Sequence, residues 1–302
     1  DSTIEMNVNY QNAPTDFLSF QLAVEGLKGG HSGVDIHEDR GNAVVFLSRV
    51  IDSMQRNIDA RVVTLQGGDK HNAIPREAFA TILISPESVS DAQIIISEKQ
   101  AELMNEFGSV ETKMKITLAG LEDSPNESLS GESQQNLIGL LRTIPHGVLK
   151  YSHDVPGLVE TSNNLASVKC NGAKYTINSS TRSSIAEALN AQRERIEIMA
   201  KSYNSNVEQD KPYPGWTPNI KSPILEITKN IYSEMLDGEP NVCAIHAGLE
   251  CGIIGEKVND MDMISFGPTI KGPHSPDERV EIESVDKFWN LLIKILEKLA
   301  EK

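Results

Sequence analysis

Residues 17–58 read FLSFQLAVEGLKGGHSGVDIHEDRGNAVVFLSRVIDSMQRNI, and the spacing of the apolar residues changes along this stretch. In Phe17–Glu25 apolar residues recur every second position, which is the period of a half-buried strand. In Arg40–Ile58 they recur every three or four positions, at Val44, Leu47, Ile51, Met54 and Ile58. That spacing is typical of an amphipathic helix. The stretch therefore predicts a strand, a glycine-rich loop and a helix.

The residues that follow extend this pattern to a complete unit. Two strands are predicted, at Arg61–Gln66 and Glu77–Ile84. A helix follows, opened by the capping-box pair Ser90 and Gln93, and then a further strand at Lys113–Leu118. The order strand–helix–strand–strand–helix–strand is that of the ferredoxin-like fold. We therefore expect a ferredoxin-like half within residues 1–125.

Residues 126–210 repeat part of this order. A helix is predicted at Leu137–Leu141, followed by strands at Leu158–Lys169 and Lys174–Ser180. The capping-box pair Ser184 and Glu187 then predicts the start of a second helix. This helix–strand–strand–helix order resembles the middle of the first half. We therefore expect a partly duplicated α+β domain over residues 1–210.

The polar segment Lys201–Thr217 is rich in proline and glycine, which indicates a domain boundary. Beyond it we expect a helix that begins at Ser222–Pro223, a strand-like segment MDMISFGP (261–268), and a last helix. The apolar face of that last helix comprises Val285, Phe288, Leu292, Ile295 and Leu299. Residues 211–302 are too few for an independent core of this kind. The fold class is α/β, with this segment as part of a larger domain.

Composition limits the function. The chain has 302 residues and a net charge of −15, which argues against binding to nucleic acid or to anionic membranes. No apolar run approaches the roughly 20 residues that span a bilayer. Three cysteines favour a reducing compartment over a disulfide framework. As given, the chain shows no signal peptide, so we expect a cytoplasmic protein.

The glycine-rich loop holds the first candidate site residue, His31. Glycines on both sides can present one side chain at a sharp turn, although such turns are also common as plain connectors. GHSG does not have the G-x-S-x-G spacing of a nucleophile elbow, which excludes a serine hydrolase. His37 and Asp39 form an H-x-D pair, but Asp39 is more simply explained as an N-cap of the helix that follows.

Two further groups could bind a metal. Cys243, His246 and Cys251 lack an evident fourth zinc ligand, so a buried cysteine pair beside a polar histidine is the simpler expectation. His274 lies in a loop rich in glycine and proline, and Asp277 and Glu278 follow it. Carboxylates near a metal-ligating histidine orient its ring, so this pattern fits a metal ligand or an acidic surface loop.

Several stretches together resemble the dinuclear-zinc exopeptidases, and within them the bacterial aminoacyl-histidine dipeptidases. The stretches are GLKGGHSGVDIHEDRGNA, HNAIPREAFA, VPGLVETSNNLASV, TRSS, CAIHAGLECGII and MDMISFGPTIKGPHSPDERVEI. The resemblance implies hydrolysis of Xaa-His dipeptides with two zinc ions. It implies that residues 1–210 are a lid that forms homodimers, and that residues 211–302 end a zinc-binding α/β catalytic domain.

The resemblance also implies residue roles. His274 matches a zinc ligand, and His31 matches the lid histidine that stabilises the oxyanion. Arg182, Asn72, Asn164 and Glu250 match substrate-binding positions, with Arg182 reading the terminal carboxylate of the dipeptide. A guanidinium suits that task because it pairs bidentately with a carboxylate.

The remaining zinc ligands and the general base of these enzymes have no match in this sequence. It contains no Glu-Glu pair, and its H-x-D is the segment His37–Asp39. We therefore expect a C-terminal portion of such an enzyme that is inactive alone, because one ligand cannot hold two zinc ions. The alternatives are a non-catalytic binding or oligomerisation module, and an acylase or tripeptidase of the same superfamily.

Overall fold

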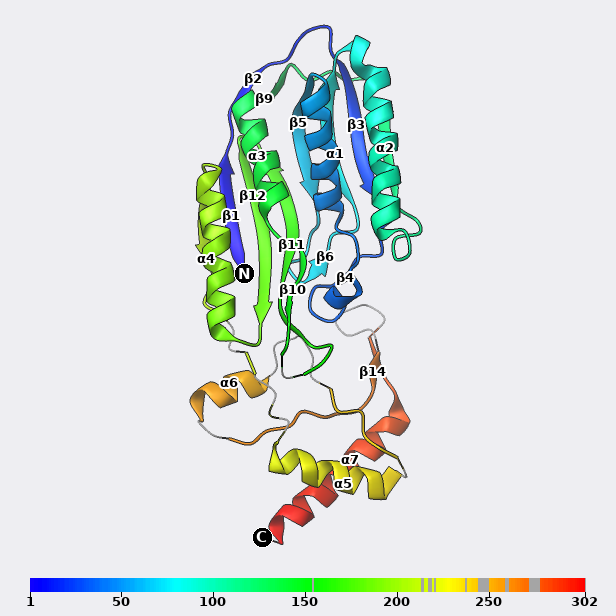
Figure 1. Ribbon diagram of the computed structural model, residues 1–302, viewed down its shortest axis with the longest axis vertical. Coiled ribbons are helices and arrows are strands. Elements are labelled where there is room, and N and C mark those ends of the chain that lie inside the picture. The colour runs from blue at the N-terminus through cyan, green and yellow to red at the C-terminus, as the bar shows by residue number, and fades with distance from the viewer. Residues whose placement is uncertain are drawn as a thin grey trace. The chain divides into compact units, whose positions relative to one another are not determined.

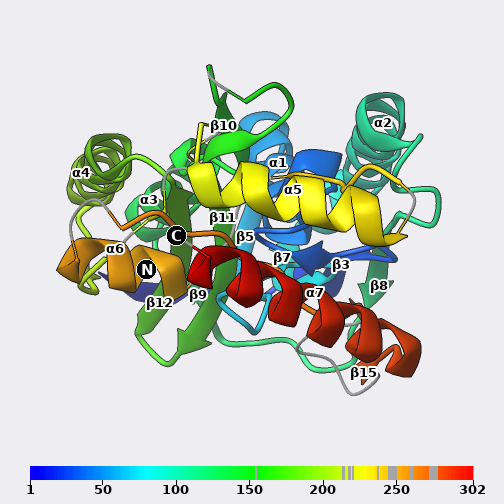
Figure 2. The ribbon, with the colours of Figure 1, turned by 90° about the horizontal axis from the view of Figure 1, so that it is seen from below.

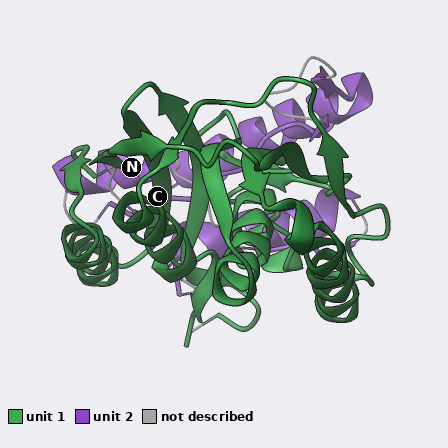
Figure 3. Cartoon of the chain, turned by 90° about the horizontal axis from the view of Figure 1, so that it is seen from above, with its two compact units in different colours: residues 1–212, 245–247 green, residues 213–244, 248–302 purple. Residues whose placement is uncertain are grey.

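The computed structural model describes residues 1–153, 155–212, 215–216, 219, 221–236, 238–243, 250–258, 261–271 and 278–301. They form two compact units (Figure 3). Unit 1 contains Asp1–Pro212, and unit 2 contains the described residues from 215 onward. Among the described helices, none has the length and apolar character needed to cross a membrane.

Unit 1 is an antiparallel sheet with helices packed along one face (Figures 1 and 2). Its main strands are β1 (Ser2–Asn7), β3 (Leu18–Glu25), β5 (Ala60–Gly67), β7 (Ala78–Ile84), β8 (Lys115–Gly120), β10 (Gly147–Tyr151), β11 (Val159–Asn171), β12 (Lys174–Ser183) and β13 (Asn206–Gln209). Its helices are α1 (Ala43–Asn57), α2 (Val89–Phe107), α3 (Gly131–Thr143) and α4 (Ala186–Ser202). Short pairs join β2 (Tyr10–Asn12) to β9 (Glu127–Leu129), and β4 (Gly30–His31) to β6 (Ala73–Ile74).

The first half of unit 1 is ferredoxin-like, as predicted. The chain order is β3, α1, β5, β7, α2, β8, and the sheet order is β5-β7-β3-β8. The apolar face of α1 packs on the sheet and includes Val44, Leu47 and Ile51, each at most 1% exposed. The predicted start of α2 is wrong, because the helix begins at Val89 and Ser88 caps it without a side-chain hydrogen bond.

The second half repeats the same fold completely, which exceeds the partial duplication that we expected. Its chain order is β1, α3, β11, β12, α4, β13, and its sheet order is β11-β12-β1-β13. Strands β1 and β13, absent from the sequence prediction, supply the first and last members. The predicted capping pair at Ser184 and Glu187 is wrong, because Ile185 precedes α4 and makes no side-chain cap.

The two halves join where β5 meets β11, so that one sheet runs through both. Val168 pairs with Gly67 at this junction. The next residue, Gly68, has a φ of +70°, and a Cβ there would lie 2.1 Å from the Ala166 carbonyl oxygen. Only glycine combines that backbone conformation with so close an approach.

Side chains of the second half cover the rest of the β5 edge. Gln134 on α3 accepts a hydrogen bond from the Val62 backbone N–H (2.8 Å) and donates one to the Ala60 carbonyl (3.0 Å). The buried Tyr175 hydroxyl accepts one from the Leu65 N–H (3.1 Å). An edge strand needs such partners when it is buried. These three backbone groups at the β5 edge are thus satisfied within the chain.

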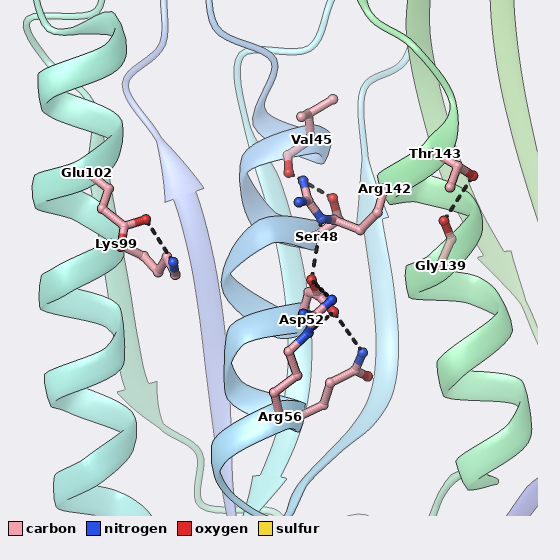
Figure 4. A network of polar contacts seen from close by, with 10 residues as sticks. Val45, Ser48, Asp52, Arg56, Lys99, Glu102, Gly139, Arg142 and Thr143 are labelled. Atoms are coloured by element: carbon pink, nitrogen blue, oxygen red, sulfur yellow. Dashed lines mark hydrogen bonds and ion pairs between the residues drawn. The ribbon is translucent and has the colours of Figure 1, made fainter.

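A polar network also ties the helices of the two halves together (Figure 4). Asp52 on α1 forms an ion pair with Arg56 one turn later (3.0 Å) and contacts Arg142 on α3 (3.5 Å). Its carboxylate also accepts a hydrogen bond from Gln55 (3.2 Å). Asp52 therefore joins helices from both halves.

Unit 2 contains α5 (Pro223–Leu236), α6 (Glu250–Lys257), α7 (Ile282–Ala300) and a small pair of strands, β14 (Ile270–Lys271) and β15 (Arg279–Val280). The predicted start of α5 is confirmed, and Ser222 caps it by accepting a hydrogen bond from Leu225. The predicted strand over 261–268 is wrong. Its Asp262 side chain instead accepts a hydrogen bond from the Ile224 N–H at the start of α5.

Helix α7 is confirmed, but its exposed face is more apolar than expected. Leu291 and Ile295 are buried, whereas Ile282, Val285, Trp289 and Leu296 are exposed.

Candidate functional site

His31 lies in a loop of residues 28–41, which we term the His31 loop, at one end of unit 1 (Figure 1). Its strand β4 pairs with β6, where His31 is opposite Ala73. Next to it, the Ser32 N–H donates to the Asn72 carbonyl (2.8 Å). The backbone around His31 is therefore held by the segment that contains Asn72.

The imidazole of His31 has a defined tautomer. Its Nδ1 accepts hydrogen bonds from the backbone N–H groups of Gly33 (3.1 Å) and Val34 (3.0 Å). In a neutral imidazole one nitrogen accepts and the other carries the proton. The Nε2 of His31 therefore carries the proton and can act as a hydrogen-bond donor.

Arg40 braces the His31 loop from inside. Its guanidinium donates to the Gly29 carbonyl (2.6 Å) and pairs with Asp35 (3.2 Å), whose carboxylate also accepts from the His31 N–H (2.7 Å). Gly30 has a φ of +142°, and a Cβ there would lie 2.1 Å from Arg40 Nη1. The predicted role of the glycines is thus specific: Gly30 leaves room for Arg40.

Three of the predicted substrate-binding residues converge beside this loop. Asn164 on β11 donates to the Ala73 carbonyl (2.8 Å), next to Asn72. Arg182 on β12 contacts the Ser32 hydroxyl (3.5 Å). Ser162 pairs with Arg182 and Asn164 pairs with Ser180, so Asn164 and Arg182 share one face of the strand pair. Segments distant in sequence therefore bring His31, Asn72, Asn164 and Arg182 to one place.

Two polar atoms of this group are buried without a hydrogen-bond partner. They are Arg182 Nε, a donor, and Asn164 Oδ1, an acceptor. Burial lowers the pKa of the Arg182 guanidinium from its ordinary value. Buried polar atoms are nearly always paired, so this donor and this acceptor on one face are candidates for binding a polar ligand.

A second histidine connects the His31 loop to the rest of unit 1. Asn42 caps α1 by accepting from Val44 and donates to the Leu165 carbonyl (2.8 Å). Its amide also lies 3.2 Å from His146 Nδ1, which must accept because an amide N–H₂ can only donate. Burial lowers the pKa of His146 to about 4, against a smaller opposing effect of its hydrogen bond with the Arg40 backbone.

Several predicted roles near the site are corrected. Asn42, rather than Asp39, is the N-cap of α1, and Asp39 ends a 3₁₀ turn with a φ of 52°. The cysteine pair is not buried, because Cys243 is exposed and Cys251 is half-buried. The sequence analysis missed the roles of Arg40, Asn42 and His146, because each depends on a partner that the fold brings close.

The remaining candidates lie in the second part of the chain. Glu250 is the first residue of α6 in unit 2 and is exposed. His246, His274 and Asp277 lie outside the described residues. Within the described ranges, no group of three or more histidine, cysteine, aspartate or glutamate side chains could hold a metal ion.

Comparison with known proteins agrees with the fold. Residues 22–111 match the family model of the peptidase dimerisation domain. The cytosol non-specific dipeptidase of Escherichia coli (strain K12) is 36% identical over 302 residues, which are 100% of this chain and 62% of that protein. The crystal structure of aminoacylhistidine dipeptidase from Vibrio alginolyticus superimposes with a TM-score of 0.90, at 35% identity, over 98% of this chain and 60% of that one.

The chain thus spans about three fifths of the length of both proteins. The identity extends over the whole chain, and the M20 family model falls within the first ferredoxin-like half. The chain is therefore similar to these dipeptidases over its whole length, and its residues 22–111 match the peptidase dimerisation domain.

Proposed function

We propose that the chain is part of a metal-dependent dipeptidase that hydrolyses Xaa-His dipeptides. In this proposal residues 1–210 form a lid and dimerisation domain. The expected division into halves 1–125 and 126–210 is wrong in one respect, because β1 pairs with β12 and β13 and so belongs to the second half. Residues 211–302 form the C-terminal segment of the catalytic domain. The names of the two relatives support a dipeptidase, and one of them supports a histidine-containing substrate.

The observation that carries the proposal is the pair of unpaired buried atoms, Arg182 Nε and Asn164 Oδ1. The free carboxylate of a dipeptide would accept from Arg182, and an N–H group of the same ligand would donate to Asn164. A ligand that carries both a carboxylate and an amide would offer partners to both atoms, and a dipeptide is the smallest peptide of this kind.

His31 and Asn72 complete the proposed site. The Nε2–H of His31 would donate to the scissile carbonyl oxygen, because Nδ1 is occupied by Gly33 and Val34. A donor aimed at a developing oxyanion is worth about 3–4 kcal/mol of transition-state stabilisation. Asn72, whose carbonyl fixes Ser32, would contact the substrate through its half-buried side chain.

The resemblance implies two zinc ions, with His274 as one ligand and Glu250 near the substrate. Among the described residues, no group of three or more histidine, cysteine, aspartate or glutamate side chains could hold a metal ion. We propose that the further zinc ligands and the general base are not supplied by these 302 residues. The chain alone would therefore be inactive.

The proposed partners are a dipeptide and a second copy of the protein. The dimerisation family supports a homodimer through the lid. Because one side of β5 is already covered by the second half, such a dimer would use other surfaces of unit 1. The relative from E. coli is named for the cytosol, which supports a cytoplasmic location.

Ligand binding to the 302-residue chain tests the substrate site. We expect β-alanyl-histidine to shift the NMR signals of Arg182 and Asn164, and its C-terminal amide to shift them much less. Arg182→Gln should weaken binding about 30-fold or more, because truncating one partner of a buried charge pair costs about 2–5 kcal/mol. Arg195→Gln, at an exposed position of α4, is the matched control.

Equal effects of the two substitutions would exclude Arg182 as the carboxylate partner. Hydrolysis of β-alanyl-histidine by the 302-residue chain with added zinc, at an enzyme-like rate, would contradict the proposed inactivity of this chain alone.

A further inference from the structure

A buried carboxylate outside the proposed substrate site holds the His31 loop at both ends. Glu111, in the turn after α2, is 1% exposed. Its Oε2 accepts from the Lys28 N–H and its Oε1 accepts from the Gly41 N–H, each at 2.8 Å. One side chain thus clamps the first and last residues of the loop.

These hydrogen bonds are strong and specific. A carboxylate that accepts from backbone N–H groups forms charge-assisted bonds, and losing its partners in a buried place is costly. No ion pair of Glu111 occurs within the described ranges, so the two N–H groups are what compensates its charge there. Both bonds are therefore needed for the carboxylate to stay buried.

The clamp is coupled to the imidazole through the loop. Gly29, next to Lys28, accepts from Arg40, which precedes Gly41. Arg40 pairs with Asp35, and Asp35 accepts from the His31 N–H. A movement of either end would therefore displace Arg40, then Asp35, and finally the turn in which Gly33 and Val34 donate to His31.

We propose that Glu111 is the positioning residue of His31. By fixing both ends of the loop, it holds the imidazole in one orientation and one tautomer, so that Nε2 points to a fixed place in unit 1. The proposal rests on the proposed role of His31 as the oxyanion donor. It extends that role to a residue 80 positions later in the chain.

The test compares Glu111→Gln with Glu106→Gln in the 302-residue chain. Glu106 is exposed at the end of the same helix and pairs with Arg49, so the control removes a surface charge of the same kind. Two signals are read by NMR: amide hydrogen exchange in the loop, and the ¹⁵N shifts of the His31 ring, which report its tautomer.

The glutamine side chain of Glu111→Gln has one acceptor oxygen, so its N–H₂ group would face the N–H of Lys28 or of Gly41, and that hydrogen bond would be lost. We expect the protection of the Lys28, Gly41, Gly33 and Val34 amides to fall at least about tenfold. We also expect the His31 ring signals to move toward a mixture of tautomers. Glu106→Gln should change neither signal. A merely structural role would lower protection without altering the ring tautomer.

The proposal is overturned if Lys28 and Gly41 lose protection while Gly33, Val34 and the His31 tautomer stay unchanged. If Glu111→Gln fails to fold, amide hydrogen exchange of the Lys28, Gly41, Gly33 and Val34 amides in the unmodified chain tests the proposal instead. Equal opening free energies for the four amides would support a common clamp, and unequal ones would refute it. No substrate is involved, so a failure here is distinct from a failure of the proposed dipeptidase activity.

Discussion

Arg182 is half-buried next to Ser32, and its Nε is buried without a hydrogen-bond partner. Such a side chain destabilises the protein unless a ligand pairs with it. Binding sites often retain groups of this kind, at the expense of stability. Arg182 therefore links the stability of unit 1 to its proposed function.

Replacing Arg182 by methionine should stabilise the free protein. The substitution keeps an unbranched side chain and removes a desolvated charge, so we expect the free energy of unfolding to rise by about 1 kcal/mol. Arg195→Met, on the exposed face of α4, should leave it unchanged. Urea titrations of both variants measure the effect, and a loss of stability in Arg182→Met would show that the guanidinium is well compensated.

His146 should make stability depend on pH. Its pKa is lowered from 6.5 to about 4 by burial, so the folded state takes up the proton less readily than the unfolded state. Stability from this group is complete above pH 6.5 and is lost as the pH falls toward 4, by at most about 1.4 kcal/mol per pH unit.

The measurement for His146 is the free energy of unfolding between pH 7 and pH 4. His146→Gln should show a shallower decline than the unmodified chain, whereas His37→Gln, at an exposed position, should follow the unmodified chain. Parallel curves for all three proteins would mean that His146 is protonated without cost in the folded state.

At the scale of elements, the β5 edge shows how two similar halves become one sheet. Strand β5 pairs with β11 at Gly67, and Gln134 and Tyr175 form hydrogen bonds with three further backbone groups of β5. A side chain of helix α3 therefore supplies the hydrogen bonds that a neighbouring strand would otherwise make with part of β5. Substitutions of single residues at this junction test the arrangement.

Gln134→Ala should be strongly destabilising. It leaves the Val62 N–H and the Ala60 carbonyl without partners in a buried place, which costs about 2–5 kcal/mol in total. Gln135→Ala, one residue later on the exposed side of α3, should cost less than about 0.5 kcal/mol. Thermal unfolding followed by circular dichroism compares them, and similar melting temperatures would contradict the role of Gln134.

Gly68→Ala should separate strain from close contact. Gly68 and Gly172 both have positive φ, but a Cβ at Gly68 would lie 2.1 Å from the Ala166 carbonyl, whereas nothing lies within 4 Å at Gly172. At either position, alanine in the left-handed backbone conformation should lower the free energy of unfolding by about 1–2 kcal/mol. Gly68→Ala should cost about 1–3 kcal/mol more by overpacking. Chemical unfolding measures this difference, and equal costs would mean that β11 can move away from β5.

The elements were predictable where their pattern is local. The alternation in β3 and the helical spacing in α1 identified both elements and the first ferredoxin-like half. Strand β13 has only four residues, which is too short for a clear sequence pattern. Strand β1 is identified as part of the second half only by its pairing with β12, which lies about 170 residues later in the sequence. The completeness of the second half therefore could not be predicted. The convergence of Asn164, Arg182 and His31 likewise depends on strand register, which no local pattern records.

At the scale of the whole molecule, the two units differ in how much they bury. Unit 1 has a continuous core between sheet and helices. In unit 2, helix α5 has no buried residue, and α7 exposes Ile282, Trp289 and Leu296. Apolar faces of this extent usually mark surfaces that another segment or protein covers. That residues 211–302 are part of a larger domain stays a prediction.

Hydrogen exchange should reflect this difference. Amides of α5 and α7 should exchange at least about a hundredfold faster than those of β7 and β12, because local opening there exposes little further apolar surface. Exchange followed by mass spectrometry of peptides resolves the two units. Equal protection of α7 and β12 would show that unit 2 has a stable core of its own.

The covered β5 edge has a further consequence for assembly. When two like modules meet through strand edges on separate chains, their association depends on the protein concentration. Here both modules belong to one polypeptide, so each meets the other at an effective concentration set by the connecting chain, on the order of millimolar. The eight-strand path from β13 to β8 therefore forms at any dilution, and the geometry around Asn164 and Arg182 is kept in a single molecule.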